Sequence, residues 1–124
     1  MKYIFRITPV AKPRMTQKDR WYKRSATEKY FQFKKDLLNL ALINKFIPSY
    51  GMKIVFFLPI PISWPKKKRL VYDGKPHQQK PDLDNLIKAV NDSFFDDDSK
   101  IWDITASKFW VNHPEGRIEI ENIV

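Results

Sequence analysis

The longest apolar run in the sequence, from Ile54 to Ile62, most limits what this chain can fold into. It contains Pro59 and Pro61 and is far shorter than the roughly 20 residues that a membrane helix needs. The overlapping segment MKIVFFLP, residues 52–59, is instead nearly continuously apolar over the length of a strand. This pattern is typical of an inner strand that is covered on both faces, so other elements of the chain must supply the cover.

Two segments with a helical period flank this predicted strand. Apolar residues recur on one arc between about Thr27 and Phe46 and again between about Asn85 and Phe94, which predicts two packed amphipathic helices. Pro48 and Gly51 are expected to end the first of them. The predicted inward faces are Tyr30, Phe33, Leu37, Leu40 and Ala41 in the first helix, and Leu86, Ala89, Val90 and Phe94 in the second.

A short third helix and three further strands complete the prediction. Ser63 and Pro65 are typical of an N-cap and an early-turn residue, and they open a helix through KKKRL that stops by Gly74. Residues 113–116 are expected to form a hairpin turn between the last two strands. The order β-α-β-α-α-β-β indicates a small single-domain α/β protein over residues 1–124, a two-layer sandwich with a mixed sheet. The three further strands are residues 2–8, 101–111 and 117–123.

The absence of cysteine excludes several kinds of site. No disulfide framework, thiolate metal site or cysteine nucleophile can form, which fits a reducing cytoplasm. Zinc is poorly served by two histidines, His77 and His113. The opening residues MKYIFRITPV lack the apolar core of a signal peptide. We therefore expect a cytoplasmic protein with no membrane association.

The net charge of +9 conceals a division along the chain. Residues 1–80 carry 19 Lys and Arg against 4 Asp and Glu, whereas residues 81–124 carry 4 against 10. Aromatic side chains such as Trp21 and Trp64 lie among the basic residues, a combination that suits phosphate contacts with base or sugar stacking. Either basic run alone is also compatible with solubilising surface, but together they predict nucleic acid as partner. The predicted DNA-binding residues are Lys12, Arg14, Lys18, Arg20, Lys23, Arg24, Lys66, Lys67, Lys68, Arg69 and Lys80.

The acidic third contains the segment PDLDNLIK, residues 81–88, followed by Asp92 and the run 96–98. If the segment from Asp82 to Asp84 is extended, both carboxylates lie on one side. Two carboxylates about 4 Å apart repel by about 4 kcal/mol at an effective dielectric near 20, so such a cluster needs a cation, protons or separation. Oxygen ligands without His or Cys favour Mg²⁺ or Mn²⁺, which could activate water for phosphodiester hydrolysis.

Structural interpretations of the same residues remain open at this point. Asp84 is a plausible helix cap, and Lys88 with Asp92 is a plausible solvated i,i+4 pair on a stripe that begins at Asp84. The run 96–98 also fits an exposed loop. A calcium loop is excluded, because the positions after Asn85 contain no central Gly and no Glu at the twelfth position.

The stretch SWPKKKRLVYDGKPHQQKPDLDNLIKAVNDSFFDDD, residues 63–98, resembles the core of the RusA family of Holliday junction resolvases. These are small endodeoxyribonucleases common in bacteria, phages and prophages. The resemblance also includes Lys-Pro-Arg at 12–14 and so covers most of the chain. Some members have several arginines just before the D-x-D segment, whereas this chain has Gln-Gln-Lys-Pro at 78–81, so we expect junction affinity or sequence preference to differ from theirs.

The resemblance implies a RusA-like fold and specific site residues. By position, Asp82, Asp84 and Asp98 would bind catalytic Mg²⁺, with Asp97 as the alternative third ligand. Lys88 would be needed for cleavage. Members of the family act as homodimers that introduce paired nicks across a four-way junction.

The sequence therefore predicts a Mg²⁺-dependent endodeoxyribonuclease that resolves branched DNA in recombination and repair, with Mn²⁺ as a substitute metal. Two rival interpretations stay open. One is a non-catalytic DNA-binding module or phage remnant, and the other is a less selective nuclease of flaps or forks.

Overall fold

The apolar segment at the middle of the chain forms the central strand of a four-stranded sheet. In the computed structural model, which describes residues 1–14 and 25–123, this strand is β2 (Gly51–Pro59). The strand order is β1-β4-β2-β3, where β1 is Lys2–Phe5, β3 is Asp103–Val111 and β4 is Arg117–Asn122. β2 and β3 are parallel, and β4 runs antiparallel to both β1 and β2. The sheet is therefore mixed, as expected.

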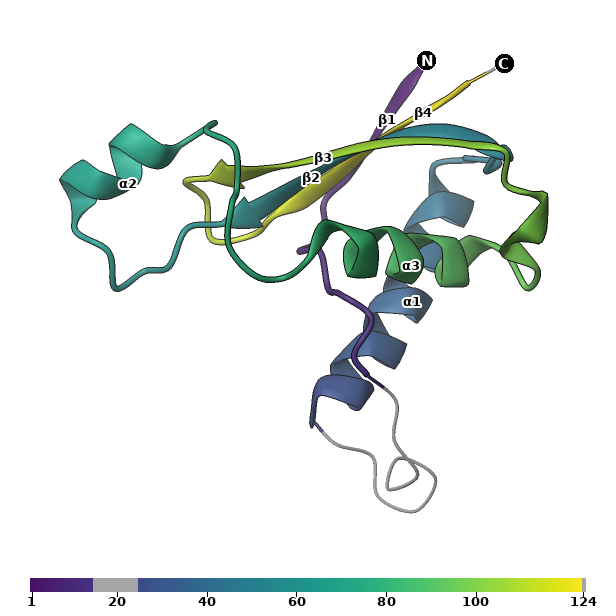
Figure 1. The fold of residues 1–124 in the computed structure, drawn as a ribbon, viewed down its shortest axis with the longest axis horizontal. Coiled ribbons are helices and arrows are strands. Elements are labelled where there is room, and N and C mark those ends of the chain that lie inside the picture. The colour runs from purple at the N-terminus through teal and green to yellow at the C-terminus, as the bar shows by residue number, and fades with distance from the viewer. Residues whose placement is uncertain (15–24, 124) are drawn as a thin grey trace.

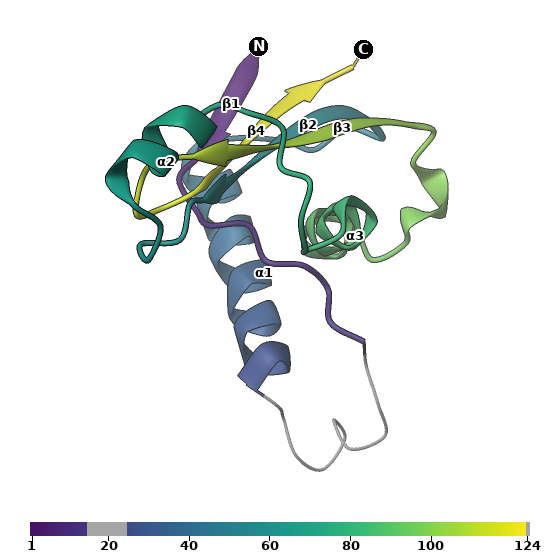
Figure 2. The same ribbon diagram turned by 60° about the vertical axis from the view of Figure 1, so that its left-hand side comes forward.

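The helices lie mainly on one side of this sheet, as Figures 1 and 2 show. They are α1 (Ser25–Ile43), α2 (Lys66–Tyr72) and α3 (Leu83–Phe94), and a short 3-10 helix, η2 (Asp98–Lys100), precedes β3. The predicted α/β order is thus confirmed. α1 and α3 cover one face, so the prediction that β2 is covered on both faces is wrong. Ile54 and Phe56 on β2 are buried, whereas Lys53 on the opposite face is exposed.

The predicted hairpin between the last two strands is also wrong. β3 and β4 both pair with β2 and lie on opposite sides of it. A five-residue link suits a hairpin, but it is also long enough to cross the end of one intervening strand, about 10 Å. Gly116 permits this crossing, because a Cβ at this position would collide with the carbonyl oxygen of Phe57. The parallel β2–β3 pair needs a long crossover, which α2 and α3 provide.

Two helix ends differ from the sequence prediction. α1 ends at Ile43, before Pro48 and Gly51, because Phe46 N–H donates to the Ala41 carbonyl and Lys45 N–H donates to that of Leu42. Lys45 has a φ of 55°, so a Schellman motif built on a non-glycine residue ends the helix. At α2 the N-cap is Pro65, not Ser63, and no side chain caps it.

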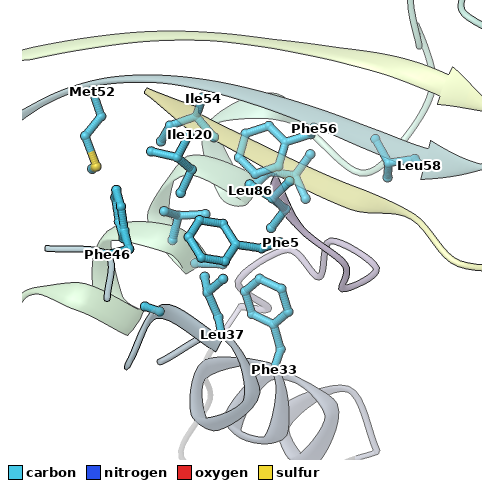
Figure 3. Close-up of a cluster of buried hydrophobic side chains, with 14 of the residues drawn as sticks. Phe5, Phe33, Leu37, Phe46, Met52, Ile54, Phe56, Leu58, Leu86 and Ile120 are labelled. Atoms are coloured by element: carbon cyan, nitrogen blue, oxygen red, sulfur yellow. The ribbon is translucent and has the colours of Figure 1, made fainter. Parts of the chain in front are cut away.

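The core lies between the sheet and the two long helices (Figure 3). Phe5 of β1, Leu37 of α1 and Leu86 of α3 are fully buried there. Burying a side chain of this size contributes roughly 1.5–3 kcal/mol. The same packing fixes α3 beneath the sheet, with its charged residues turned away from the core. α2 has no buried residue and is instead attached to the end of the sheet by Trp64, whose ring lies 5.0 Å from that of Trp110.

Candidate functional site

The loop that leads into the D-L-D-N segment is fastened to strand β3. His77 N–H donates to the carbonyl of Lys108, and Trp110 N–H donates to that of Lys75. The ring of His77 is buried 4.0 Å from that of Trp110. Burial, followed by the charge of Lys108, lowers the pKa of His77, so its ring is neutral near pH 7. The loop therefore has one fixed course along the sheet.

Lys108 fixes the end of this loop. Its ammonium group donates to the carbonyl oxygens of Gln79 at 2.5 Å and Pro81 at 2.6 Å, next to the cis peptide between Lys80 and Pro81. Sequence reasoning missed Lys108. The available signal was a charged residue at an inward position of an alternating strand, between Ala106 and Trp110. Because Asp82 follows Pro81 directly, the two bonds from Lys108 restrain the chain immediately before α3 begins.

The two aspartates of the segment lie at the N-terminal end of α3 and are exposed. Asp82 is the N-cap residue with extended backbone angles, although its side chain makes no capping hydrogen bond. Asp84 is already in the first helical turn, so the condition of an extended Asp82–Asp84 segment is not met. Helix capping by Asp84 is likewise excluded by its position. Its carboxylate lies 3.8 Å from the Lys88 ammonium, and both side chains are more than half exposed. Such a pair contributes at most about 0.5 kcal/mol.

Asp92 belongs to a different environment. Its carboxylate accepts a 2.5 Å hydrogen bond from the buried Tyr30 hydroxyl and lies 2.8 Å from the ammonium of Lys12. Partial burial opposes its charge, but the bonds from Lys12 and Tyr30 outweigh burial, so the pKa of Asp92 is lowered. The predicted single charged stripe is therefore divided, because Asp92 pairs with Lys12 and not with Lys88.

An open cavity of about 370 Å³ lies beside the N-terminal half of α3. Its lining brings together Lys12 and Arg14 from the N-terminal segment and Lys88 from the helix, with Pro13 and Asn85. Lys12 N–H also donates to the Asn85 carbonyl, which joins the two segments directly. Three predicted functional cations thus share one cavity next to Asp84. Sequence reasoning missed Asn85, although it lies inside the recognised motif.

The third predicted metal ligand lies elsewhere in the chain. Asp98 opens η2, beyond the C-terminal end of α3, and is exposed. Asp97 caps the same turn by accepting from Ser99 N–H at 3.0 Å, and hydrogen bonds with Ser99 lower its pKa. Over residues 1–14 and 25–123, no three His, Asp or Glu side chains gather closely enough to hold a metal ion. A single copy of this part of the chain therefore does not assemble Asp82, Asp84 and Asp98.

The other predicted DNA contacts lie on α2 and its surroundings. Lys66, Lys67 and Lys68 are exposed, and the Lys68 ammonium lies 4.0 Å from the ring centre of Trp64. Arg69 is half-buried and lines a second cavity with Asn112 and His113, neither of which was predicted. Lys80 is exposed on the loop before Asp82. In Figure 1 the start of α3 is the end of that helix that faces α2. Outside the described residues lie Lys18, Arg20, Lys23 and Arg24.

Comparisons with known proteins identify one family. A family model described as endodeoxyribonuclease RusA matches residues 5–121. This span includes both basic segments, the whole of α3 and η2. A search of curated proteins found no match. Among the described residues, no helix is long and apolar enough to cross a membrane.

Proposed function

The chain belongs to the RusA family of endodeoxyribonucleases, and we propose that it resolves four-way DNA junctions by paired nicking in recombination and repair. The family acts on branched DNA and is generally dependent on divalent metal. In this proposal residues 1–124 form a single RusA-like domain that works in the cytoplasm with Mg²⁺, or with Mn²⁺ as substitute. The family match is the observation that carries it.

The cavity beside α3 supports the proposal that the DNA backbone binds there. Lys12, Arg14 and Lys88 line it, and Asp84 lies within 4 Å of Lys88. Cations placed around a phosphate stabilise the negative charge that develops on its oxygens during hydrolysis. In the proposal Lys88 binds the phosphate to be cleaved, while Lys12 and Arg14 hold the adjoining backbone. The exposed lysines of α2 extend the same surface along a junction arm.

The proposed metal ligands require two copies of the chain. α3 has 12 residues and is about 18 Å long, so Asp82 and Asp98 lie at opposite ends of a rigid rod. Ligands of one ion must lie within a few ångströms of one another. A two-fold axis across α3 would bring Asp82 and Asp84 of one protomer to Asp98 of the partner subunit. We therefore propose a homodimer with two composite sites. Asp98 is preferred to Asp97, because Asp97 already caps η2.

Exposed apolar side chains favour such a dimer. They lie where α1 ends and β2 and β3 begin, near the C-terminal end of α3, where Tyr50 stacks on Phe95 at 5.3 Å. The Trp102 side chain is 67% exposed, and the backbone N–H of Trp102 donates to the Tyr50 carbonyl. Large apolar side chains that gather on a surface commonly mark an interface. The exposed members of this group are Ile43, Ile47, Tyr50 and Trp102.

In the proposal the metal ion, Lys88 and Lys108 have separate roles in cleavage. A divalent ion would supply Lewis-acid activation at the phosphodiester. Lys88 would hold a non-bridging oxygen of the phosphate, and the loop fixed by Lys108 would keep Asp82 in place. A two-fold protein can present two such sites to the two strands of a pseudo-symmetric junction.

The test is a substitution at Asp84. Asp84→Asn keeps the size of the side chain, so we expect junction binding to survive and nicking with Mg²⁺ to fall by at least about 100-fold, the usual scale for one essential electrostatic group. Asp36→Asn is the matched control, because Asp36 is an exposed carboxylate on α1 that accepts from Gln32. Unchanged nicking by Asp84→Asn would remove Asp84 from the mechanism. The assay should span four-way, forked, linear and single-stranded DNA, since equal cleavage of duplex and junction would favour the less selective nuclease.

A further inference from the structure

We propose that Asp92 is a positioning residue, which with Tyr30 holds Lys12 at the edge of the α3 cavity in the orientation that binds DNA. The inference rests on the proposed function and deepens it, because it assigns a role to a carboxylate outside the proposed metal ligands. No motif of the sequence gives Asp92 this role.

The geometry places Asp92 between a buried donor and a surface cation. Tyr30 of α1 is 1% exposed, and its hydroxyl donates to Asp92 Oδ2 at 2.5 Å. The same oxygen lies 2.8 Å from Lys12 Nζ, whose side chain is about one third exposed. The chain of contacts therefore runs from the core, through α3, to the segment that carries Lys12 and Arg14. Burial and the bond to Asp92 raise the pKa of Tyr30, so the hydroxyl stays a donor at neutral pH.

A second contact restrains the same lysine. Lys12 N–H donates to the Asn85 carbonyl, so both the backbone and the ammonium group of Lys12 are bound to α3. A free lysine loses rotamer freedom when it binds a phosphate, and that loss weakens binding. In the folded protein the two bonds to α3 already restrict this freedom at Lys12. Its neighbours Pro13 and Arg14 line the same cavity.

Charge and positioning predict opposite effects for the same substitution. Asp92→Asn removes a negative charge close to the basic cavity, so charge alone would strengthen DNA binding. If Asp92 positions Lys12, the substitution releases the lysine and weakens binding. We expect the dissociation constant for a synthetic four-way junction to rise about tenfold, which is about 1.4 kcal/mol.

The route through Lys12 can be tested with a double-mutant cycle. Lys12→Ala alone should weaken binding and make the slope of log K against log salt shallower by about 0.9, the value of one phosphate contact. Asp92→Asn should reduce the slope similarly. In the Lys12→Ala background Asp92→Asn should no longer weaken binding, because its effect is transmitted by a side chain that is already absent.

Two further variants separate positioning from general damage. Tyr30→Phe keeps the ring in the core and removes only the hydroxyl, so it should weaken junction binding in the same direction but by less. Asp36→Asn removes one exposed carboxylate elsewhere on α1 and should leave the salt slope unchanged. Thermal melting of each variant sets a temperature at which all are folded, so that the binding constants compare native proteins.

The inference fails if Asp92→Asn binds the junction as tightly as the unaltered chain or more tightly. It also fails if the effect of Asp92→Asn persists in full without Lys12, because Asp92 would then act by another route. Failure of the proposed function would appear differently, as a lack of preference for junctions over linear duplex by the unaltered chain. In that case the same comparisons on linear duplex would still decide the role of Asp92.

Discussion

Mixing two inactive variants should restore nicking if the proposed sites are shared between protomers. Asp84→Asn and Asp98→Asn each damage every site in their own homodimers. In a mixed dimer, one composite site receives both substitutions and the other receives none. Within one chain these two aspartates lie beyond reach of a common ion, because they are at opposite ends of α3, which has 12 residues and is about 18 Å long.

The expected amplitude follows from random pairing. Equal amounts of the two variants, refolded or expressed together, give about one half mixed dimers, each with one intact site of two, so about one quarter of the unaltered sites return. The product should be a singly nicked junction, since each mixed dimer cleaves one strand. Purification of the mixed dimers through a different tag on each variant raises the fraction of unaltered sites to about one half. Nicking of a labelled synthetic junction on a denaturing gel measures both rate and product.

The control uses two aspartates at the same end of α3. A mixture of Asp82→Asn with Asp84→Asn damages one ligand in every site under the shared arrangement, so no rescue is expected. If the first mixture is no more active than its parents, the three aspartates do not form composite sites across the dimer. Rescue in the control mixture would equally refute the assigned geometry.

Two other predictions concern Lys108, which supports the site, and the partly buried carboxylates Asp92 and Glu119. Lys108→Met keeps the aliphatic stem but removes both hydrogen bonds to the loop carbonyls. Each bond contributes about 1 kcal/mol, so the substitution should lower the free energy of unfolding by roughly 1–3 kcal/mol and slow nicking. Unchanged melting and nicking would exclude Lys108 as a support. Despite partial burial, bonds from Arg117 and Lys2 lower the pKa of Glu119, and Asp92 behaves likewise. Stability from these groups is present above their unfolded pKa values near 4 and is lost as the pH falls through the lower folded values. The denaturant concentration at the unfolding midpoint should therefore decrease as the pH is lowered below about 4.5. This decrease should be smaller for Glu119→Gln than for the unaltered chain.

Local pattern predicted the elements well but not how they are arranged. The helical period around Phe33 and Leu37 gave α1, and alternation gave β3, because those signals depend on neighbours within one element. The link at 113–116 suited a hairpin equally well, and only the pairing of both flanking strands with β2 decided against it. Which face of β2 the helices cover also depends on the arrangement of the whole sheet, and the sequence of β2 alone does not determine it.

The same distinction applies to the site. The D-L-D-N segment and its lysine are contiguous, so a motif sufficed to find them. Lys108 and Tyr30 act from other elements, and their contacts with the loop and with Asp92 join residues 27 to 62 positions apart. No spacing rule connects such pairs. The sequence motif therefore identified the residues proposed for catalysis. It did not identify Lys108 and Tyr30, whose hydrogen bonds hold parts of the site in place.

The division of charge along the sequence has a different meaning in the folded protein. The basic N-terminal segment and the acidic third are in direct contact, since Lys12 binds both Asp92 and the Asn85 carbonyl. Five of the acidic residues form two contrasting kinds. Asp92 and Glu119 each face two donors and have lowered pKa values, which is the environment of a structural carboxylate. Asp82, Asp84 and Asp98 are exposed at the two ends of α3, where a cation from solution can reach them. Neutralising either kind should therefore have separable consequences: loss of acid stability or DNA affinity for the first, and loss of cleavage with binding intact for the second.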